Sequence, residues 1–306
     1  MSTTDEDSVQ TTPPTNRLAW RDTNIYGSDT RDTLIGGLWA SEGITNAYLY
    51  SMLEIICFFT DTFYLYDDRK QLVRKDGQQL RPGNYFVVTT GSISVTDEVP
   101  LICAVSLPSG PRVEPFRESV FQRDRQCVIT GKKAMHAHVG RWMGFEATHI
   151  FPLAFERQWN DRNLSCLITV PPANESHGSI NSVQNGIMLT CVMHQFFASY
   201  DLAINPDDNY KIVCFTADLS RFHIAGRHLD QTFIDNPLRP PDDLLHWHFR
   251  QAVLVNIKGV GEPTYEDDFP PGSDVMGEIM RGPKADERME FELFTRFNAM
   301  VTPAAG

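Results

Sequence analysis

The sequence predicts an α+β protein with a strand–strand–helix unit near the middle of the chain. Strand-like and helix-like segments are interspersed along its 306 residues, of which 42% are hydrophobic and 22% charged, as in ordinary globular proteins. Residues 145–201 contain a strand-like run, a turn signal and a capped helix, in that order. We therefore divide the chain into a tail (1–17), an amino-terminal mixed, β-rich module (18–116), a central domain (117–215) and a helical carboxy-terminal extension (216–306).

The amino-terminal elements follow from composition and periodicity. Residues 1–17 are rich in Thr, Asp and Pro and offer little to bury, so we expect a disordered tail. Residues 43–63 form a helix-like apolar stretch, whereas residues 62–68 and 83–95 alternate as strands do. These strands flank the turn-rich sequence RKDGQQLRPG, and the segment SLPSGPRVEPF is typical of a linker or crossing loop.

The later elements are predicted in the same way. Residues 117–124 indicate a short helix, and QCVITGKK at 126–133 indicates an apolar strand closed by a glycine turn. Asn185 and Gly186 are a turn signal, and Thr190 can cap a helix that carries His194 on its first turns. After a loop region rich in Pro and Asp, residues 242–257 and 284–300 predict two further helices.

Charge and apolar patterning limit the classes of function. The net charge is −12, and Lys plus Arg against Asp plus Glu number 9 against 15 in residues 1–116, 9 against 9 in 117–215 and 9 against 15 in 216–306. The acidity therefore lies in the flanks, which could meet a protein partner, and the chain lacks the overall basic excess of dedicated nucleic-acid binders.

No membrane or secretory segment is predicted. The first residues are acidic and polar, unlike a signal peptide, and the most apolar window, AYLYSMLEIICFF, is too short to span a bilayer and contains Glu54. The six cysteines form no C-x-x-C pair, which favours reduced thiols over a zinc knuckle or a disulfide scaffold. We expect an intracellular protein, cytoplasmic or nuclear, without membrane association.

Three polar residues of the central domain can converge on one small volume. His149 lies in a strand-like run, Asn185 in a turn, and His194 on the helix that follows. This arrangement sets an imidazole base opposite an imidazole metal ligand, with an amide bracing the loop between them. It suits metal-assisted hydrolysis of a phosphodiester.

Four segments carry a resemblance to a known family. CVITG (127–131), THIFPL (148–153), INSVQNGIMLTCVMHQFF (180–197) and INPDDNYKIVCF (204–215) together resemble the HNH endonuclease domain of fungal proteins, which has the ββα-metal fold. The resemblance implies that His149 is the general base, that Asn185 holds the loop and that His194 binds one divalent ion, which could be Mg, Mn, Zn or Ni. It implies nucleic acid as substrate, with DNA favoured over RNA.

Two positions depart from the family pattern and keep other functions open. Ala198 stands where relatives commonly carry an aspartate one helical turn after the helix histidine. Thr148 precedes the strand histidine, at a position where metal-binding relatives often carry an acidic residue or a histidine. Glu146 and Asp201 are then the further candidate metal ligands. The alternatives are a catalytically impaired HNH-fold binding module and a small-molecule enzyme that uses the same pocket, since the fold does not decide among them.

Other histidines and tryptophans are weaker candidates. His136 and His138 have the spacing of residues on one strand face, but they lie in a basic loop bounded by glycines. His246 and His248 lie on a predicted helix, where residues two apart diverge. We expect Trp142 and Trp159, further candidates for stacking on bases, to belong to the core.

Overall fold

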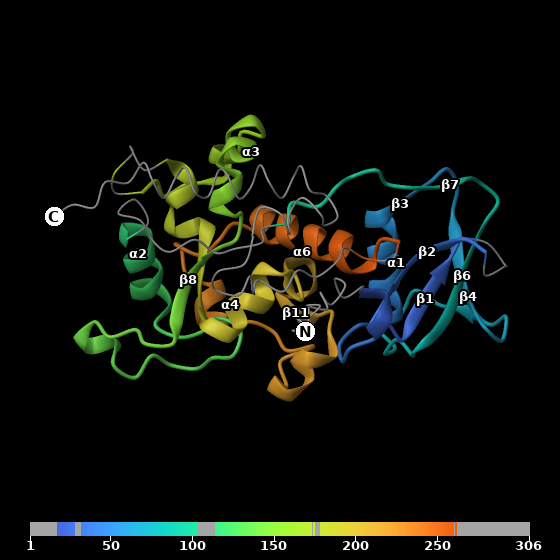
Figure 1. The fold of residues 1–306 in the computed structure, drawn as a ribbon, viewed down its shortest axis with the longest axis horizontal. Coiled ribbons are helices and arrows are strands. Elements are labelled where there is room, and N and C mark those ends of the chain that lie inside the picture. Colours follow the sequence, from blue (N-terminus) through green and yellow to red (C-terminus); the bar gives the residue numbers. More distant parts are fainter. Residues whose placement is uncertain are drawn as a thin grey trace, which may run out of the picture.

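The structure, a computed structural model, describes residues 17–27, 32–102, 114–172, 174, 178–259 and 261. Figure 1 shows the sheet of the amino-terminal module at one end of the molecule and the elements around strand β8 (Phe145–His149) at the other. Helix α6 (Asp242–Ile257) runs between them. The expected tail at 1–16 and the expected helix at 284–300 lie outside the described residues.

The amino-terminal module is built on one mixed sheet. In its described part, five strands follow the order β2-β1-β6-β4-β5. The pair β1 and β6 is parallel, and the other neighbours are antiparallel. Helix α1 shares a core with this sheet, and a short pair, β3 and β7, follows the helix. The bounds are β1 (Thr23–Tyr26), β2 (Leu34–Leu38), α1 (Asn46–Ile56), β3 (Cys57–Phe59), β4 (Phe63–Asp67), β5 (Leu72–Val73), β6 (Gly83–Thr89) and β7 (Ile93–Val95).

Helix α1 is shorter than the apolar stretch that predicted it. It begins after Thr45, whose hydroxyl accepts the Tyr48 backbone N–H at 3.3 Å, and it ends at Ile56. Cys57 is extended, with φ −131° and ψ 148°, and opens strand β3. The aromatic pair Phe58 and Phe59 favours a strand over a helix, and antiparallel pairing with β7 satisfies its backbone.

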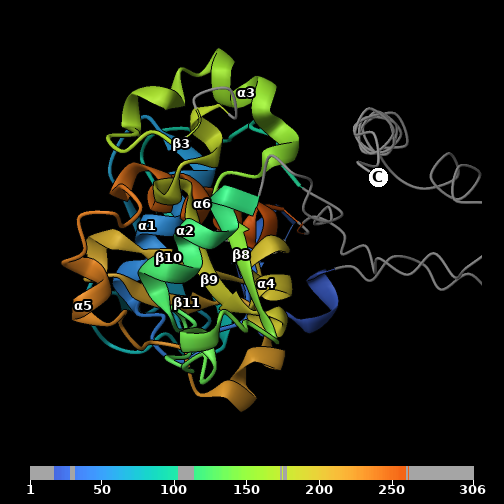
Figure 2. The ribbon, with the colours of Figure 1, turned by 90° about the vertical axis from the view of Figure 1, so that its left-hand side faces the viewer.

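The central region contains a two-stranded ribbon with a helix on each face. Strand β9 (Gly186–Thr190) pairs antiparallel with β8, and both α2 (Glu114–Asp124) and α4 (Cys191–Ala198) contact the ribbon. Figure 2 views the molecule from the end that carries this unit. The remaining elements are α3 (Glu156–Asp161), β10 (Leu202–Asn205), β11 (Lys211–Cys214) and α5 (Gln231–Ile234), with short 3₁₀ helices at Arg17–Trp20, Ala137–Val139, Leu153–Phe155, Leu164–Leu167, Ser179–Asn181, Val183–Asn185, Pro206–Asp208 and Ala217–Phe222.

The strand predicted at 126–133 is wrong, because this segment is a turn. The backbone N–H of Gly131 donates to the Cys127 carbonyl at 2.8 Å, and that of Cys127 donates to the Lys132 carbonyl at 2.9 Å. Gly131 has a φ of +72°, which a glycine adopts without strain. The apolar run is buried by this tight turn, so hydrophobicity alone gave a misleading strand signal.

Helix α6 has the bounds that its amphipathic pattern predicted, but it is not a peripheral extension. Leu244 and Leu245 belong to the core around β9 and α4, whereas Ala252 and Leu254 belong to the core of the amino-terminal module. Arg17, assigned from sequence to the disordered tail, is also buried. The two larger hydrophobic cores of the described chain therefore depend on a helix from beyond the predicted boundaries.

Candidate functional site

The ribbon places alternate residues of β8 on its two faces. In the register, Phe145 lies opposite Thr190 and His149 opposite Gly186. Because side chains alternate along a strand, Phe145 and Ala147 pack toward α2, together with the ring of His149. Glu146 points to the opposite face, toward α4 and His194.

Helix α4 starts directly after β9, as its capping residue predicted. The Thr190 hydroxyl accepts the Met193 backbone N–H at 3.4 Å. A threonine in this position satisfies one of the unpaired N–H groups of the first turn. His194 follows on that first turn, close to the ribbon.

His149 is held by a ring on one side and an amide at its edge. Its imidazole stacks on Phe116 of α2, with ring centroids 3.8 Å apart and planes inclined by 12°. Its Nε2 lies 3.1 Å from Oδ1 of Asn181, a buried residue. An amide oxygen only accepts hydrogen bonds, so Nε2 carries the hydrogen and Nδ1 keeps the lone pair. The neighbours therefore select one tautomer and one orientation of the ring.

The close approach of Phe116 explains the glycine opposite His149. A Cβ added to Gly186 would meet Cζ of Phe116 at 2.5 Å and Cγ2 of Val120 at 2.8 Å. The backbone of Gly186 is ordinary strand, with φ −141° and ψ 157°. Glycine is therefore required here because there is no space for a Cβ, and not because of the backbone conformation.

His149 is neutral at physiological pH. Burial lowers its pKa to about 4; the hydrogen bond that its ring donates to Asn181 opposes this shift, and the field of His194 adds to it. A neutral imidazole with a free lone pair can accept a proton. His149 and His194 each have a partner of their own, Asn181 for the first and Glu146 for the second.

Asn185 is a brace inside the protein. Its side chain is fully buried; Oδ1 accepts the Phe151 N–H at 2.9 Å, and Nδ2 donates to the carbonyls of Phe151 at 3.0 Å and Ile180 at 2.9 Å. These bonds tie the loop after β8 to the segment before β9. Asn181, the partner of His149, is the residue that follows Ile180, so Asn185 fixes His149 indirectly.

His194 is paired with Glu146. Its Nδ1 lies within hydrogen-bonding distance of the Glu146 carboxylate. The thiol of Cys191 is close by, and burial, followed by the charge of Glu146, raises its pKa. Histidines that bind metals commonly donate their other ring N–H to a carboxylate in this way. The contact therefore suits Glu146 to orient His194 as well as to ligate an ion.

The donor set for a metal is small. Among the described residues, no group of three or more His, Cys, Asp or Glu side chains is arranged to hold an ion. Ala198, the last residue of α4, contributes no donor. An ion at His194 would need water and substrate oxygens to complete its coordination, which is the usual condition of Mg in sites that act on phosphates.

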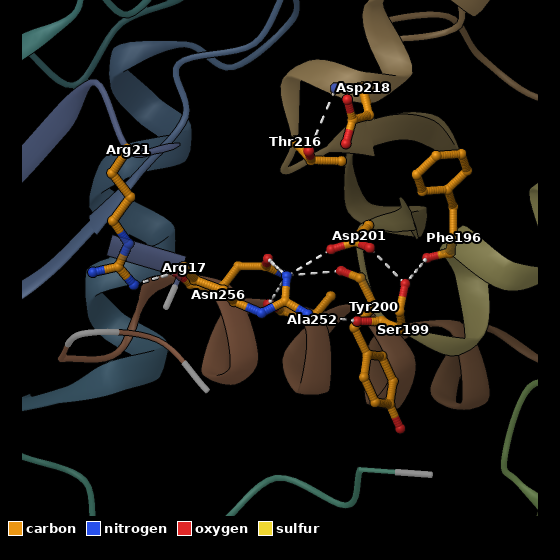
Figure 3. Close-up of polar contacts among 10 residues, drawn as sticks. All are labelled: Arg17, Arg21, Phe196, Ser199, Tyr200, Asp201, Thr216, Asp218, Ala252 and Asn256. Atoms are coloured by element: carbon orange, nitrogen blue, oxygen red, sulfur yellow. Dashed lines mark hydrogen bonds and ion pairs between the residues drawn. The ribbon is translucent and has the colours of Figure 1, made fainter. Parts of the chain in front are cut away.

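Asp201 lies in a different set of contacts. Its carboxylate pairs with Arg17 at 2.6 Å and accepts the Ser199 hydroxyl at 2.6 Å (Figure 3). Arg17 also donates to Oδ1 of Asn256 on α6, at 2.5 Å, and to the Ser199 carbonyl just after α4, at 3.0 Å. The structure thus places Asp201 in a brace among the amino-terminal segment, α4 and α6, and we leave it out of the proposed metal site.

The other candidate side chains fall outside this unit. His136 and His138 are exposed in a loop, with ring centroids 6.3 Å apart. His246 pairs with Asp207 at the surface, whereas His248 is buried and stacks on Phe197, as expected for positions that diverge on a helix. Trp142 and Trp159 are buried, as predicted.

Sequence reasoning missed Phe116 and Asn181. Phe116 comes from a helix distant in sequence, and one phenylalanine among 19 carries no signal of its contact with His149. Asn181 lies within the INSVQNG segment, but the turn signal there points to Asn185. The only available signal was the presence of a second asparagine close to the first.

Comparisons with known proteins match two separate parts of the chain. Residues 20–94 match a domain of unknown function (DUF8573), and residues 127–205 match an HNH endonuclease family. No curated protein and no solved structure gives a match. In the described part of the chain, no helix has the length and apolar character to cross a membrane. The second match contains His149, Asn185 and His194, and it supports an HNH endonuclease-type domain at residues 127–205.

Proposed function

We propose that this protein is a metal-dependent endonuclease that hydrolyses phosphodiester bonds in DNA, with the ribbon and α4 forming a ββα-metal site. The observation that carries the proposal is His149 itself. It is neutral and fixed in one tautomer, and it lies on the strand of a region that matches an HNH endonuclease family.

In this proposal His149 is the general base. Nδ1 takes a proton from the attacking water, while Nε2–H remains bonded to Asn181 and holds the ring in place. In the protein without substrate, the low pKa of His149 makes its imidazole a weak base. A substrate phosphate near the ring would raise that pKa, because a negative charge stabilises the imidazolium.

His194 would hold one divalent ion, with Glu146 beside its Nδ1. Such an ion polarises the scissile phosphate and stabilises the leaving oxygen. Imidazole ligation favours Zn or Ni, whereas carboxylate and water ligation favours Mg or Mn. Since few protein donors gather here, we expect weak binding. Asn185 takes no part in the chemistry and keeps the loop that carries Asn181 in register.

The small donor set also favours a second candidate, an HNH-fold module that binds nucleic acid or, through its acidic flanks, a protein without cutting. Ala198, one helical turn after His194, lacks a carboxylate, and so does Thr148, the residue before His149. A requirement for His149 without any requirement for metal would instead support a small-molecule enzyme that uses the same pocket.

The test is cleavage of plasmid and single-stranded DNA by purified protein with Mg, Mn, Ni or Zn. His149→Ala should lower the rate by roughly 10²- to 10⁴-fold, the usual contribution of a general base. His246→Ala, which removes an exposed imidazole elsewhere, is the matched control and should retain full activity. Metal-dependent cleavage that survives in His149→Ala would refute the assignment, and binding without cleavage by the wild type would support the second candidate.

A further inference from the structure

The turn and loop at residues 131–144, here named the basic loop, differ from the rest of this acidic protein. Between residues 125 and 145 there are four Lys or Arg and no Asp or Glu. Lys132, Lys133 and Arg141 are exposed, and none of them forms an ion pair with a carboxylate in the described part of the chain. The even charge balance of the central region therefore hides a local positive surface.

The basic loop also exposes large apolar side chains. Met135, Met143 and Val139 are 77%, 74% and 68% exposed. Isolated apolar side chains are common on surfaces, but three on one loop, interleaved with cations that form no ion pair among the described residues, indicate a contact surface. Proteins that bind the minor groove combine cations with apolar side chains, methionine among them, that insert between base steps.

The loop is fixed at both ends. Ala134 and Trp142 are buried, and the Trp142 ring lies 4.8 Å from that of Phe121 on α2. Between these anchors the Arg141 N–H donates to the His136 carbonyl at 3.1 Å. Because the segment is already ordered by the protein, little conformational entropy is lost when it binds a partner.

The loop adjoins the candidate site. It leads directly into β8, and the carbonyl of Gly144 accepts the N–H of Cys191, the first residue of α4, at 3.2 Å. His149 is four residues beyond the start of β8, roughly 13 Å along the strand. A bound DNA strand spans that separation in a few nucleotides, because successive base pairs are about 3.4 Å apart. The loop projects from the β8 end of the molecule (Figure 1).

We propose that the basic loop binds the phosphate backbone of nucleic acid and guides it to His149 and His194; this inference rests on the proposed function. Lys132, Lys133 and Arg141 contact phosphates, and the exposed methionines and Val139 pack against sugars. The binding is independent of base sequence, because contacts to phosphate carry no sequence information.

The test measures the binding of a fluorescent duplex DNA through its fluorescence anisotropy. EDTA is present so that cleavage cannot occur. The triple variant Lys132→Ala, Lys133→Ala and Arg141→Ala should bind at least about tenfold more weakly. Its plot of log affinity against log salt concentration should be shallower by about 2.7, which corresponds to three lost phosphate contacts. The conservative pair Lys132→Arg and Lys133→Arg should bind as the wild type does.

The matched control removes three exposed cations from the amino-terminal module, with Arg69→Ala, Lys70→Ala and Arg74→Ala. Both triples lower the net charge by three, so equal weakening by the two would overturn the proposal. Binding of phosphatidylserine vesicles without binding of DNA would also overturn it. Loop-dependent DNA binding with no cleavage under any metal supports this inference and refutes the nuclease, whereas cleavage that is equally fast in the loop triple overturns the inference alone.

Discussion

Replacing Gly186 by alanine tests whether packing against Phe116 positions His149. The added methyl group would lie 2.5 Å from Cζ and 2.6 Å from Cε2 of Phe116, and 2.8 Å from Cγ2 of Val120. All three distances are well below normal van der Waals contact, and both neighbours are buried on α2. The ring of Phe116 must therefore move, together with the imidazole stacked on it.

The expected cost follows from overpacking. Forcing one methyl group into a well-packed core typically costs about 1–3 kcal/mol in the free energy of unfolding. No backbone strain contributes, because Gly186 has ordinary strand angles. The displaced imidazole should also lower cleavage activity, since small misplacements of a catalytic group can cost about 10²-fold in rate.

Urea unfolding and DNA cleavage measure the two effects. Gly77→Ala is the control, because a Cβ there meets nothing within 4 Å. Phe116→Leu should recover part of the stability lost in Gly186→Ala, which a double-mutant cycle would detect as coupling. If the free energy of unfolding of Gly186→Ala is within about 0.5 kcal/mol of the wild-type value and the variant cleaves at the wild-type rate, the stack does not position His149.

Three further predictions follow from the site. Asn185→Ala leaves the Phe151 N–H and two carbonyls without partners and should lower the free energy of unfolding by at least about 2 kcal/mol in urea; an unchanged midpoint would contradict its role as a brace. The pKa of His149 is about 4 in the folded protein against 6.5 ordinarily, so the unfolded chain binds more protons between these values and stability should fall as pH drops from 6.5 toward 4; in His149→Gln the fall should be smaller, and an equal fall would contradict the assigned pKa. Ala198→Asp, one helical turn beyond His194, should tighten Mn binding by about tenfold in isothermal titration, equivalent to about 1.4 kcal/mol, and no gain would mean that other donors already complete the site.

Local signals in the sequence predicted the ribbon, α4 and α6 well. A threonine that caps a helix, a turn at Asn185 and an amphipathic period act over a few residues, and the structure has each of these features in the predicted place. The brace formed by Asn185 was predicted through the family resemblance, and its three hydrogen bonds give that role a physical basis.

Long-range contacts could not be predicted in the same way. The stack of His149 on Phe116 joins residues 33 positions apart, and the Arg17–Asp201 pair joins residues 184 apart. Neither contact leaves a periodic or compositional trace in the sequence. Asp201 was a reasonable ligand by its proximity to α4 in sequence, but a buried arginine from the amino-terminal segment takes its carboxylate.

The packing of α6 into two cores could not be predicted from its sequence for a related reason. Its apolar pattern indicates a buried face, but it does not indicate which core buries it. The first half of α6 packs into the core around α4, and the second half packs into that of the amino-terminal module.

Chemical rescue of His149→Ala by added imidazole tests whether His149 is the general base. Removing the ring should leave a gap beside Phe116 and Asn181 and lower the single-turnover rate of DNA cleavage by roughly 10²- to 10⁴-fold. If His149 is the base, free imidazole should restore a concentration-dependent part of the rate to His149→Ala and leave the wild type unchanged. An undiminished rate in His149→Ala, with metal present and imidazole absent, would show that His149 is not the base.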